Sequence, residues 1–136
     1  MTMLLDSGVW LAARDADDEH HPYALELLAA PRPITALDLT LYEVANVGVR
    51  SWGSAERARL VAELVRAASS DTLVRVDEAH LEQAIEVAAE HGISVYDAAY
   101  VAAARRNGWT LVSTDHRDLV GRGLALAPRD AVAAGY

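Results

Sequence analysis

Short apolar segments alternate with longer amphipathic ones along this chain, and that alternation restricts its fold more than any other feature. Strands are predicted at residues 1–6, 33–37, 72–76, 110–113 and 124–128. Helices are predicted at residues 7–15, 22–31, 38–53, 54–70, 77–92 and 94–108. Strands and helices in alternation form a mostly parallel sheet, with right-handed crossovers and helices on both faces. The sequence therefore predicts an α/β fold.

Length and composition are those of one ordinary domain. The chain has 136 residues, and its 52% of hydrophobic residues is sufficient for a single core. We therefore expect one domain over residues 1–136. No apolar run approaches the roughly 18 residues of a membrane span, and the beginning of the sequence lacks the basic segment of an export signal. These features predict a cytoplasmic protein with no membrane association.

All basic residues are arginine, because the sequence contains no lysine. A P-loop, Schiff-base chemistry and a typical receiver domain each need a lysine, so the sequence argues against these functions. Because cysteine is also absent, any bound metal must have oxygen or histidine ligands. The net charge of -8 argues against binding nucleic acid by bulk charge alone, but acids around a bound cation can still present positive charge to a phosphate.

Four acidic residues are predicted to converge at one edge of the sheet. Asp6 and Asp115 each follow a predicted strand, and ligands of open parallel sheets bind beyond the carboxyl ends of the strands. Glu43 lies one turn into the helix after the second strand, and Asp97 lies at the start of the helix before the fourth. Clustered carboxylates repel one another unless a cation neutralises them, and Mg²⁺ or Mn²⁺ prefers oxygen ligands. Such a site predicts metal-dependent hydrolysis of phosphodiester bonds.

Most of these acids also have a purely structural explanation. Asp6 and Asp115 could cap the helices that follow them. Asp97 fits the acidic position of a capping box with Ser94. Glu43 is harder to explain in this way, because an unpaired charge within its largely apolar segment would be costly.

Four segments resemble, in order and spacing, the PIN domain, and most closely the VapC toxins of bacterial toxin–antitoxin pairs. The segments are "LLDSGVWLA", "LDLTLYEVANVGVR", "SVYDAAYVAAARRNG" and "LVSTDHRDL", and the resemblance extends over essentially the whole chain. It implies a three-layer α/β/α sandwich with a mostly parallel central sheet, and an endoribonuclease activity that depends on Mg²⁺ or Mn²⁺. It also implies that Asp6, Glu43, Asp97 and Asp115 are the catalytic, metal-binding residues.

Further side chains are expected to support this site. The resemblance implies that Ser113 supports the acids by hydrogen bonds, and Asn46 completes an E-x-x-N pattern with Glu43. Asp118 is interpreted as a helix-start or surface acid, and its alternative role is that of an extra ligand beside Asp115.

Gly8 departs from the family pattern, because family members often carry a second hydroxyl or an Asn two places after the first Asp. The missing side chain would loosen the orientation of Asp6, although Ser7 remains as a supporting hydroxyl. This departure favours a rival hypothesis, a PIN-like binding module with weak or no catalysis. A second rival is a phosphotransfer domain of the receiver or haloacid-dehalogenase type, which the missing lysine disfavours.

The resemblance also implies macromolecular partners. We expect a homodimer, inhibition by a small VapB-type antitoxin, and an RNA substrate cut in single-stranded loops, such as those of tRNA or rRNA. The antitoxin is expected to cover Trp10, Leu11 and Tyr42. Arginines expected near the approach to the acids are Arg14, Arg50, Arg105, Arg106 and Arg117. Aromatic residues expected to pack in the core or in an interface are Trp10, Tyr42, Trp52, Tyr96, Tyr100 and Trp109.

Overall fold

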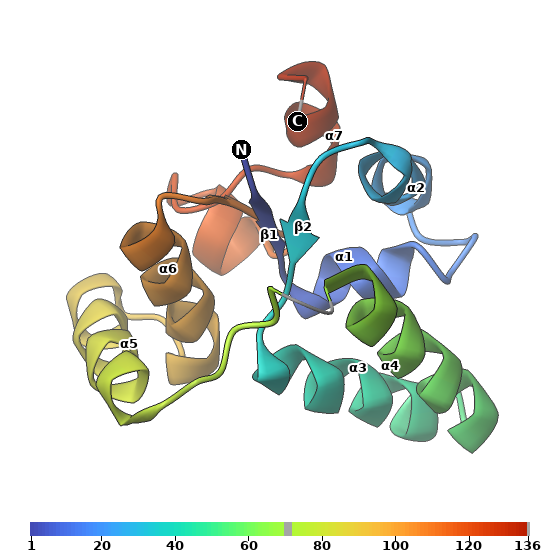
Figure 1. Cartoon of the computed structure of the whole chain (residues 1–136), viewed down its shortest axis with the longest axis horizontal. Helices are drawn as coiled ribbons and strands as arrows, with labels where there is room; N and C mark the ends of the chain where they lie inside the picture. Colours follow the sequence, from blue (N-terminus) through green and yellow to red (C-terminus); the bar gives the residue numbers. More distant parts are fainter. Residues whose placement is uncertain (70–71, 136) are drawn as a thin grey trace.

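Three short parallel strands form the centre of the computed structural model, which describes residues 1–69 and 72–135. They are β1 (Met3–Leu5), β2 (Ile34–Thr35) and β3 (Thr110–Val112), in the order β2-β1-β3. Leu4 of the central strand pairs with Thr35 on one side and with Leu111 on the other. All three strands therefore end at the same edge of the sheet (Figure 1).

Helices connect and follow these strands, close to the predicted positions. They are α1 (Ser7–Ala12), α2 (His21–Ala29), α3 (Asp38–Arg50), α4 (Ala55–Ser69), α5 (Glu78–His91), α6 (Val95–Asn107), the π-helical turn η1 (His116–Val120) and α7 (Pro128–Ala133). The predicted end of the fourth helix, residue 70, lies outside the described residues. No residue range was predicted for η1 or α7, although Asp115 was interpreted as a possible helix cap, and it does cap η1. No helix in the described part of the chain has the length and apolar character needed to cross a bilayer.

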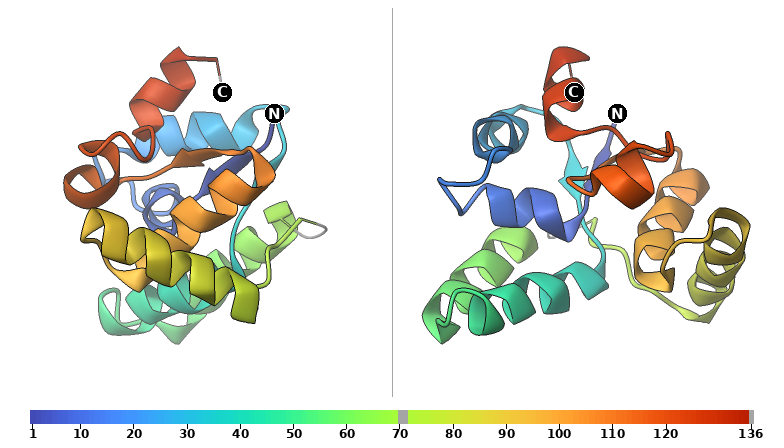
Figure 2. Two further views of the ribbon diagram at one scale, coloured as in Figure 1. Left: turned by 90° about the vertical axis from the view of Figure 1, so that its left-hand side faces the viewer. Right: turned by 180° about the vertical axis from the view of Figure 1, so that it is seen from behind.

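Helices cover both faces of the sheet, and the side chains of β1 alternate between two apolar clusters. Met3 and Leu5 pack in one cluster with residues of α1 to α4 and α7. Leu4 points into the other cluster, which α5 and α6 supply. Figure 1 shows α1 to α4 on one side of the sheet and α5 and α6 on the other, and the views in Figure 2 agree. The predicted PIN-like α/β/α arrangement with a parallel sheet is confirmed.

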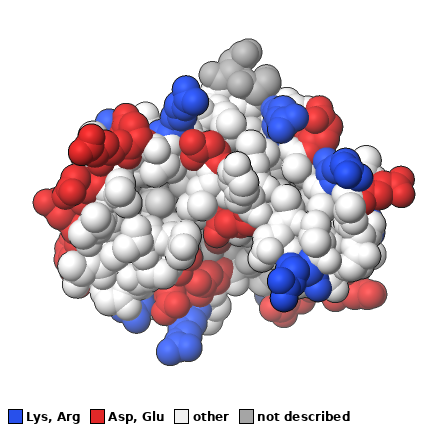
Figure 3. Space-filling view, turned by 90° about the horizontal axis from the view of Figure 1, so that it is seen from below, with Lys and Arg blue, Asp and Glu red and all other residues white. Residues whose placement is uncertain are grey.

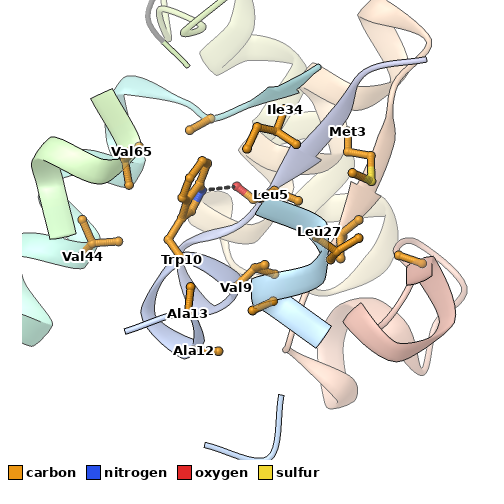
Figure 4. Packing of buried hydrophobic residues seen from close by; sticks show 14 of the residues in the cluster. Met3, Leu5, Val9, Trp10, Ala12, Ala13, Leu27, Ile34, Val44 and Val65 are labelled. Atoms are coloured by element: carbon orange, nitrogen blue, oxygen red, sulfur yellow. Dashed lines mark hydrogen bonds between the residues drawn. The ribbon is translucent and has the colours of Figure 1, made fainter. Parts of the chain in front are cut away.

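Trp10 lies in the core rather than on the surface. Its side chain is 0% exposed, and its indole N–H donates to the Leu5 carbonyl over 3.2 Å (Figure 4). Val44 of α3 and Val65 of α4 belong to the same cluster. The expectation that Trp10 packs inside is confirmed. The expectation that an antitoxin covers Trp10 is wrong, because the protein itself buries this side chain.

Two of the five predicted strands are reduced to single bridges. In segment 72–76 only Val74 pairs, with Leu37, because the N–H of Val76 turns to the Asp38 carboxylate at 3.3 Å. In segment 124–128 only Leu126 pairs, with Val112. The chain then enters α7 at Pro128, which has no N–H to donate to a sheet. The prediction of strands at these two segments was wrong beyond one residue each.

Candidate functional site

Asp6 leaves β1 at the carboxyl edge of the sheet and is held at both carboxylate oxygens. The N–H of Val9 donates to Oδ1 over 3.3 Å, so Asp6 caps α1 as the structural interpretation proposed. The Ser113 hydroxyl donates to Oδ2. This contact follows from the register of the sheet. Leu5 pairs with Val112, so Asp6 and Ser113, which follow these two residues, lie side by side. Asp6 is therefore both the cap of α1 and a residue of the site at the edge of the sheet.

Burial makes the charge of Asp6 unfavourable. Only 7% of the residue is exposed, and this burial raises the pKa of its carboxyl to about 7. The hydrogen bonds from Ser113 and Val9 oppose the rise, while the negative charges of Glu43 and Asp97 add to it. Acids from three separate segments therefore share one electrostatic environment.

Glu43 is positioned by a chain of hydrogen bonds. The Tyr100 hydroxyl donates to Glu43 Oε1 over 2.6 Å, and the Ser7 hydroxyl also bonds to this carboxylate. Because Tyr100 has only one hydroxyl proton, the Thr40 hydroxyl is the donor in its 2.7 Å contact with Tyr100. Thr40 in turn accepts from the Leu37 N–H at 3.1 Å. Half-burial raises the pKa of Glu43, and the fixed donors oppose this.

Three further acids lie within reach of a single cation. One carboxylate oxygen from each of Asp97, Asp115 and Asp118 lies within 4.8 Å of the others. The Asp118 N–H donates to Asp115 Oδ1 over 2.9 Å at the start of η1, and the Asp115 N–H donates to Ser113 Oγ over 2.9 Å. Ser94 caps α6 by accepting from the Asp97 N–H at 3.0 Å. Burial and then the charges of Asp115 and Asp118 raise the pKa of Asp97 to about 6.

The two groups of acids meet at Asp97, whose charge acts on Asp6 as well as on Asp115. Figure 3 shows acidic side chains in the hollow between two largely uncharged lobes, one of α3 and α4 and one of α5 and α6. The predicted acids thus come together, with Asp118 added to Asp97 and Asp115. Asn46 is exposed on α3, one turn after Glu43. All donors are carboxylate oxygens, which suits a hard divalent cation.

Tyr100 was assigned to packing, and its contact with Glu43 was missed. Two signals could have revealed it. Tyr100 follows Asp97 by three residues and therefore lies on the same face of α6. A buried phenol also needs a hydrogen-bond partner, and the surrounding alanines of α6 offer none in their side chains.

Tyr100→Phe is expected to weaken Mn²⁺ binding by about tenfold, because residues that hold metal ligands typically contribute ten- to a hundredfold in affinity. The substitution keeps the ring in the core and removes the hydroxyl that donates to Glu43 and accepts from Thr40. Titration calorimetry on the full chain measures this change. Tyr96→Phe is the matched control, since Tyr96 lies on the same helix with its side chain largely exposed. An unchanged affinity in Tyr100→Phe would show that Glu43 does not need this hydrogen bond.

Comparison with known proteins agrees with this geometry. The family model described as "PIN domain" matches residues 3–120. The curated protein "Ribonuclease VapC3" of Pyrobaculum aerophilum is 30% identical over an aligned length of 128 residues, and the alignment covers 86% of this chain and 92% of the relative. The residues matched by the family model therefore include every acid of the site.

Solved structures with lower identity share the fold. VapC20 of Mycobacterium tuberculosis, described as a sarcin–ricin loop cleaving toxin, is 23% identical with a TM-score of 0.71, covering 88% of this chain and 94% of that one. A toxin–antitoxin complex from Klebsiella pneumoniae matches with a TM-score of 0.68 at 20% identity, covering 93% and 97%. From the family match and the curated relative, we conclude that the chain belongs to the PIN-domain family, as a VapC-type ribonuclease toxin of toxin–antitoxin systems.

Proposed function

We propose that this ribonuclease is an endonuclease that hydrolyses RNA phosphodiester bonds with Mg²⁺ or Mn²⁺ held by its acids. The observation that carries the proposal is the approach of Asp97, Asp115 and Asp118 within 4.8 Å. Like charges at this separation are costly without a cation, and burial together with the charges of Asp115 and Asp118 raises the pKa of Asp97. Asp6 and Glu43 extend the same acidic environment toward α1 and α3.

The chain's own residues prepare the site before any cation binds. Ser113 bonds to Asp6 with its hydroxyl proton and accepts from the Asp115 N–H, so a single hydroxyl ties the two strand-end acids together. Tyr100 and Ser7 orient Glu43. When bound, a divalent cation lowers the pKa of a water and stabilises negative charge on a phosphodiester. Asp6, Glu43, Asp97 and Asp115 are proposed to hold the cation, with Asp118 as an additional candidate.

A single-stranded loop of rRNA or tRNA is the proposed substrate, in the cytoplasm. VapC20, a structural neighbour, is described as cleaving the sarcin–ricin loop, and single-stranded RNA can be bent into a recessed site. Of the arginines expected near the acids, Arg117 lies 3.9 Å from Asp118, with its side chain 92% exposed. Arg122 also approaches Asp118, at 3.8 Å. Arg105 instead contacts Glu90 on the outer side of α5 and α6.

Protein partners are proposed to bind beside the acids. A groove between α3, α5 and α6 is lined by Tyr42, Leu81, Val95 and Tyr96, all of which are exposed. The toxin–antitoxin complex among the structural neighbours supports inhibition by a VapB-type antitoxin, which would present a basic side chain to the acidic site. The proposed homodimer would likewise bury apolar surface of this kind.

The decisive experiment is cleavage of total RNA and of isolated rRNA and tRNA by the purified full chain. Reactions contain Mg²⁺, Mn²⁺ or EDTA, and a mock purification from cells without the protein controls for contaminating nuclease. We expect discrete fragments with either metal, none with EDTA, and recovery when Mn²⁺ is added in excess over EDTA. Cleavage that persists in EDTA, or that equals the mock preparation, would contradict the proposed function and favour a binding module.

A further inference from the structure

A chain with a net charge of -8 needs local positive charge to hold the phosphates of RNA beside a cluster of acids. In the described part of the chain, two arginines make an ion pair with an acid of the site. Arg117 Nε and Arg122 Nη2 lie 3.9 Å and 3.8 Å from the same atom, Asp118 Oδ1. The Asp118 carboxylate in turn has an oxygen within 4.8 Å of oxygens of Asp97 and Asp115. Both guanidinium groups therefore lie at the margin of the candidate metal site.

Arg122 is also anchored to a second element. Its Nη1 donates to the carbonyl oxygen of His91, the last residue of α5, over 2.5 Å. The carbonyl groups at the end of a helix lack partners within the helix and carry partial negative charge, so a guanidinium there is favourable both as a donor and as a cation. Residues 91 and 122 are 31 positions apart in the chain. The tertiary fold therefore fixes the place of this guanidinium beside Asp118.

The anchored guanidinium has donors left for a ligand. Arginine carries five N–H groups in one plane, and the bond to His91 uses one of them. The 3.8 Å between Nη2 and Asp118 Oδ1 is too long for a hydrogen bond, and 42% of the Arg122 side chain is exposed. A phosphate group can accept two parallel hydrogen bonds from a guanidinium. Arg122 can therefore bind a phosphate and keep its bond to His91.

Arg117 has a less restricted side chain. It is 92% exposed, and its contact with Asp118 is a surface ion pair of the kind that contributes little to stability. A long side chain that is free to rotate loses conformational entropy when it binds a ligand, whereas an anchored side chain has already lost it. Of the two arginines, Arg122 is therefore better prepared to bind a phosphate.

We propose that Arg122 is a phosphate-binding residue for the RNA substrate. Its guanidinium, held by the end of α5, contacts a phosphate of the RNA backbone next to the acids of the site. The contact is made in the bound substrate and does not change during the chemical step, so it contributes to the KM for RNA rather than to kcat. Because the contact is to the backbone, it does not select a base. The inference rests on the proposed function of the same site.

Steady-state cleavage of isolated rRNA by the full chain with Mn²⁺ tests the inference, at roughly 50 to 200 mM salt. Arg122→Gln is expected to raise KM by about tenfold at unchanged kcat, because a hydrogen bond to a charged group contributes about this factor. The slope of log(kcat/KM) against log[salt] should become shallower by about 0.7, the value for one phosphate contact to a single strand. Arg122→Lys keeps the charge and should recover KM to within about threefold of wild type.

Arg66→Gln is the matched control, because Arg66 pairs with Glu63 on α4 and its replacement changes the net charge equally. Arg117→Gln should raise KM by less than Arg122→Gln does. Titration calorimetry with Mn²⁺ separates phosphate binding from an effect on Asp118. Arg122→Gln should bind Mn²⁺ at least as tightly as wild type, because the substitution removes a positive charge beside the acids.

Equal effects of Arg122→Gln and Arg66→Gln on KM would overturn the inference in favour of a general effect of net charge. Weaker Mn²⁺ binding by Arg122→Gln would also overturn it, because the arginine would then act by orienting Asp118. A fall in kcat at unchanged KM would contradict a role in substrate binding. A wild type that cleaves no RNA would overturn the proposed function and this inference together, whereas the other three outcomes with an active wild type overturn the inference alone.

Discussion

Asp6→Asn is expected to lower RNA cleavage by about a hundredfold or more and, at the same time, to stabilise the metal-free protein at pH 8. The loss follows because the amide cannot supply a negative oxygen to a cation, and even residues behind metal ligands contribute ten- to a hundredfold. The gain follows because the wild-type protein at pH 8 holds a buried carboxylate next to other acids. Asparagine retains the ability to cap α1.

The sign of the pH dependence is set by Asp6. Its pKa is about 7 in the folded protein and 3.8 ordinarily, so the folded state binds more protons than the unfolded chain between these values. The free energy of unfolding without metal should therefore fall as pH rises through this window, by about 2 kcal/mol between pH 5.5 and pH 8. Glu43 and Asp97 have raised pKa values and act in the same direction.

Urea unfolding in EDTA at pH 5.5 and pH 8 measures both effects. Asp6→Asn should remove most of the decline with pH, so its advantage over wild type should grow by roughly 2 kcal/mol between pH 5.5 and pH 8. Asp77→Asn is the matched control, because Asp77 also caps a helix but lies on α5 outside the cluster. If the free energy of unfolding of Asp6→Asn falls with pH as steeply as that of wild type, Asp6 does not carry the buried charge.

The sequence predicted the helices and the central strands well, because both depend largely on local patterns. The predictions of strands at residues 72–76 and 124–128 were wrong because a strand forms only where a partner strand continues beside it. Val74 has such a partner in Leu37, but two residues later Val76 bonds to the side chain of Asp38 instead. The spacing of apolar residues along a helix also does not show which of them the rest of the protein buries. Tyr42 follows the helical spacing of α3 and is nevertheless 81% exposed.

The candidate site was predictable where a residue follows directly from a strand end. Asp6 and Asp115 meet through Ser113 because β1 and β3 are adjacent and in register. Asp118 reaches the cluster in the first turn of η1, where its N–H donates to Asp115 Oδ1 over 2.9 Å. Both acids were interpreted from the sequence as possible helix-start residues, but no feature of the sequence indicated a π-helical turn. The contact of Tyr100 with Glu43 joins residues 57 positions apart and depends on where the tertiary fold places α3 and α6. Such contacts come from the tertiary fold and not from local patterns.

Asp97→Asn is expected to abolish metal-dependent cleavage, with a loss of about a hundredfold or more. The charge of Asp97 acts on Asp6, and the charges of Asp115 and Asp118 act on Asp97, so Asp97 links the two groups of acids. Without that charge, Asp6 and Glu43 form one group of acids and Asp115 and Asp118 form another. Neither group has the full set of negative oxygens. The fold should survive, because Ser94 caps α6 through the backbone N–H of residue 97, and asparagine leaves that bond intact.

The assay compares cleavage of rRNA and Mn²⁺ affinity in wild type, Asp97→Asn and the Asp77→Asn control. Asp77 shares with Asp97 the start of a helix but not the acidic cluster, so its variant separates a role in capping from a role in the site. A capping role predicts equal and small effects of the two substitutions. A metal-binding role predicts that only Asp97→Asn loses affinity and cleavage together. Because the charge of Asp97 also raises the pKa of Asp6, its loss should in addition move the decline of metal-free stability to lower pH.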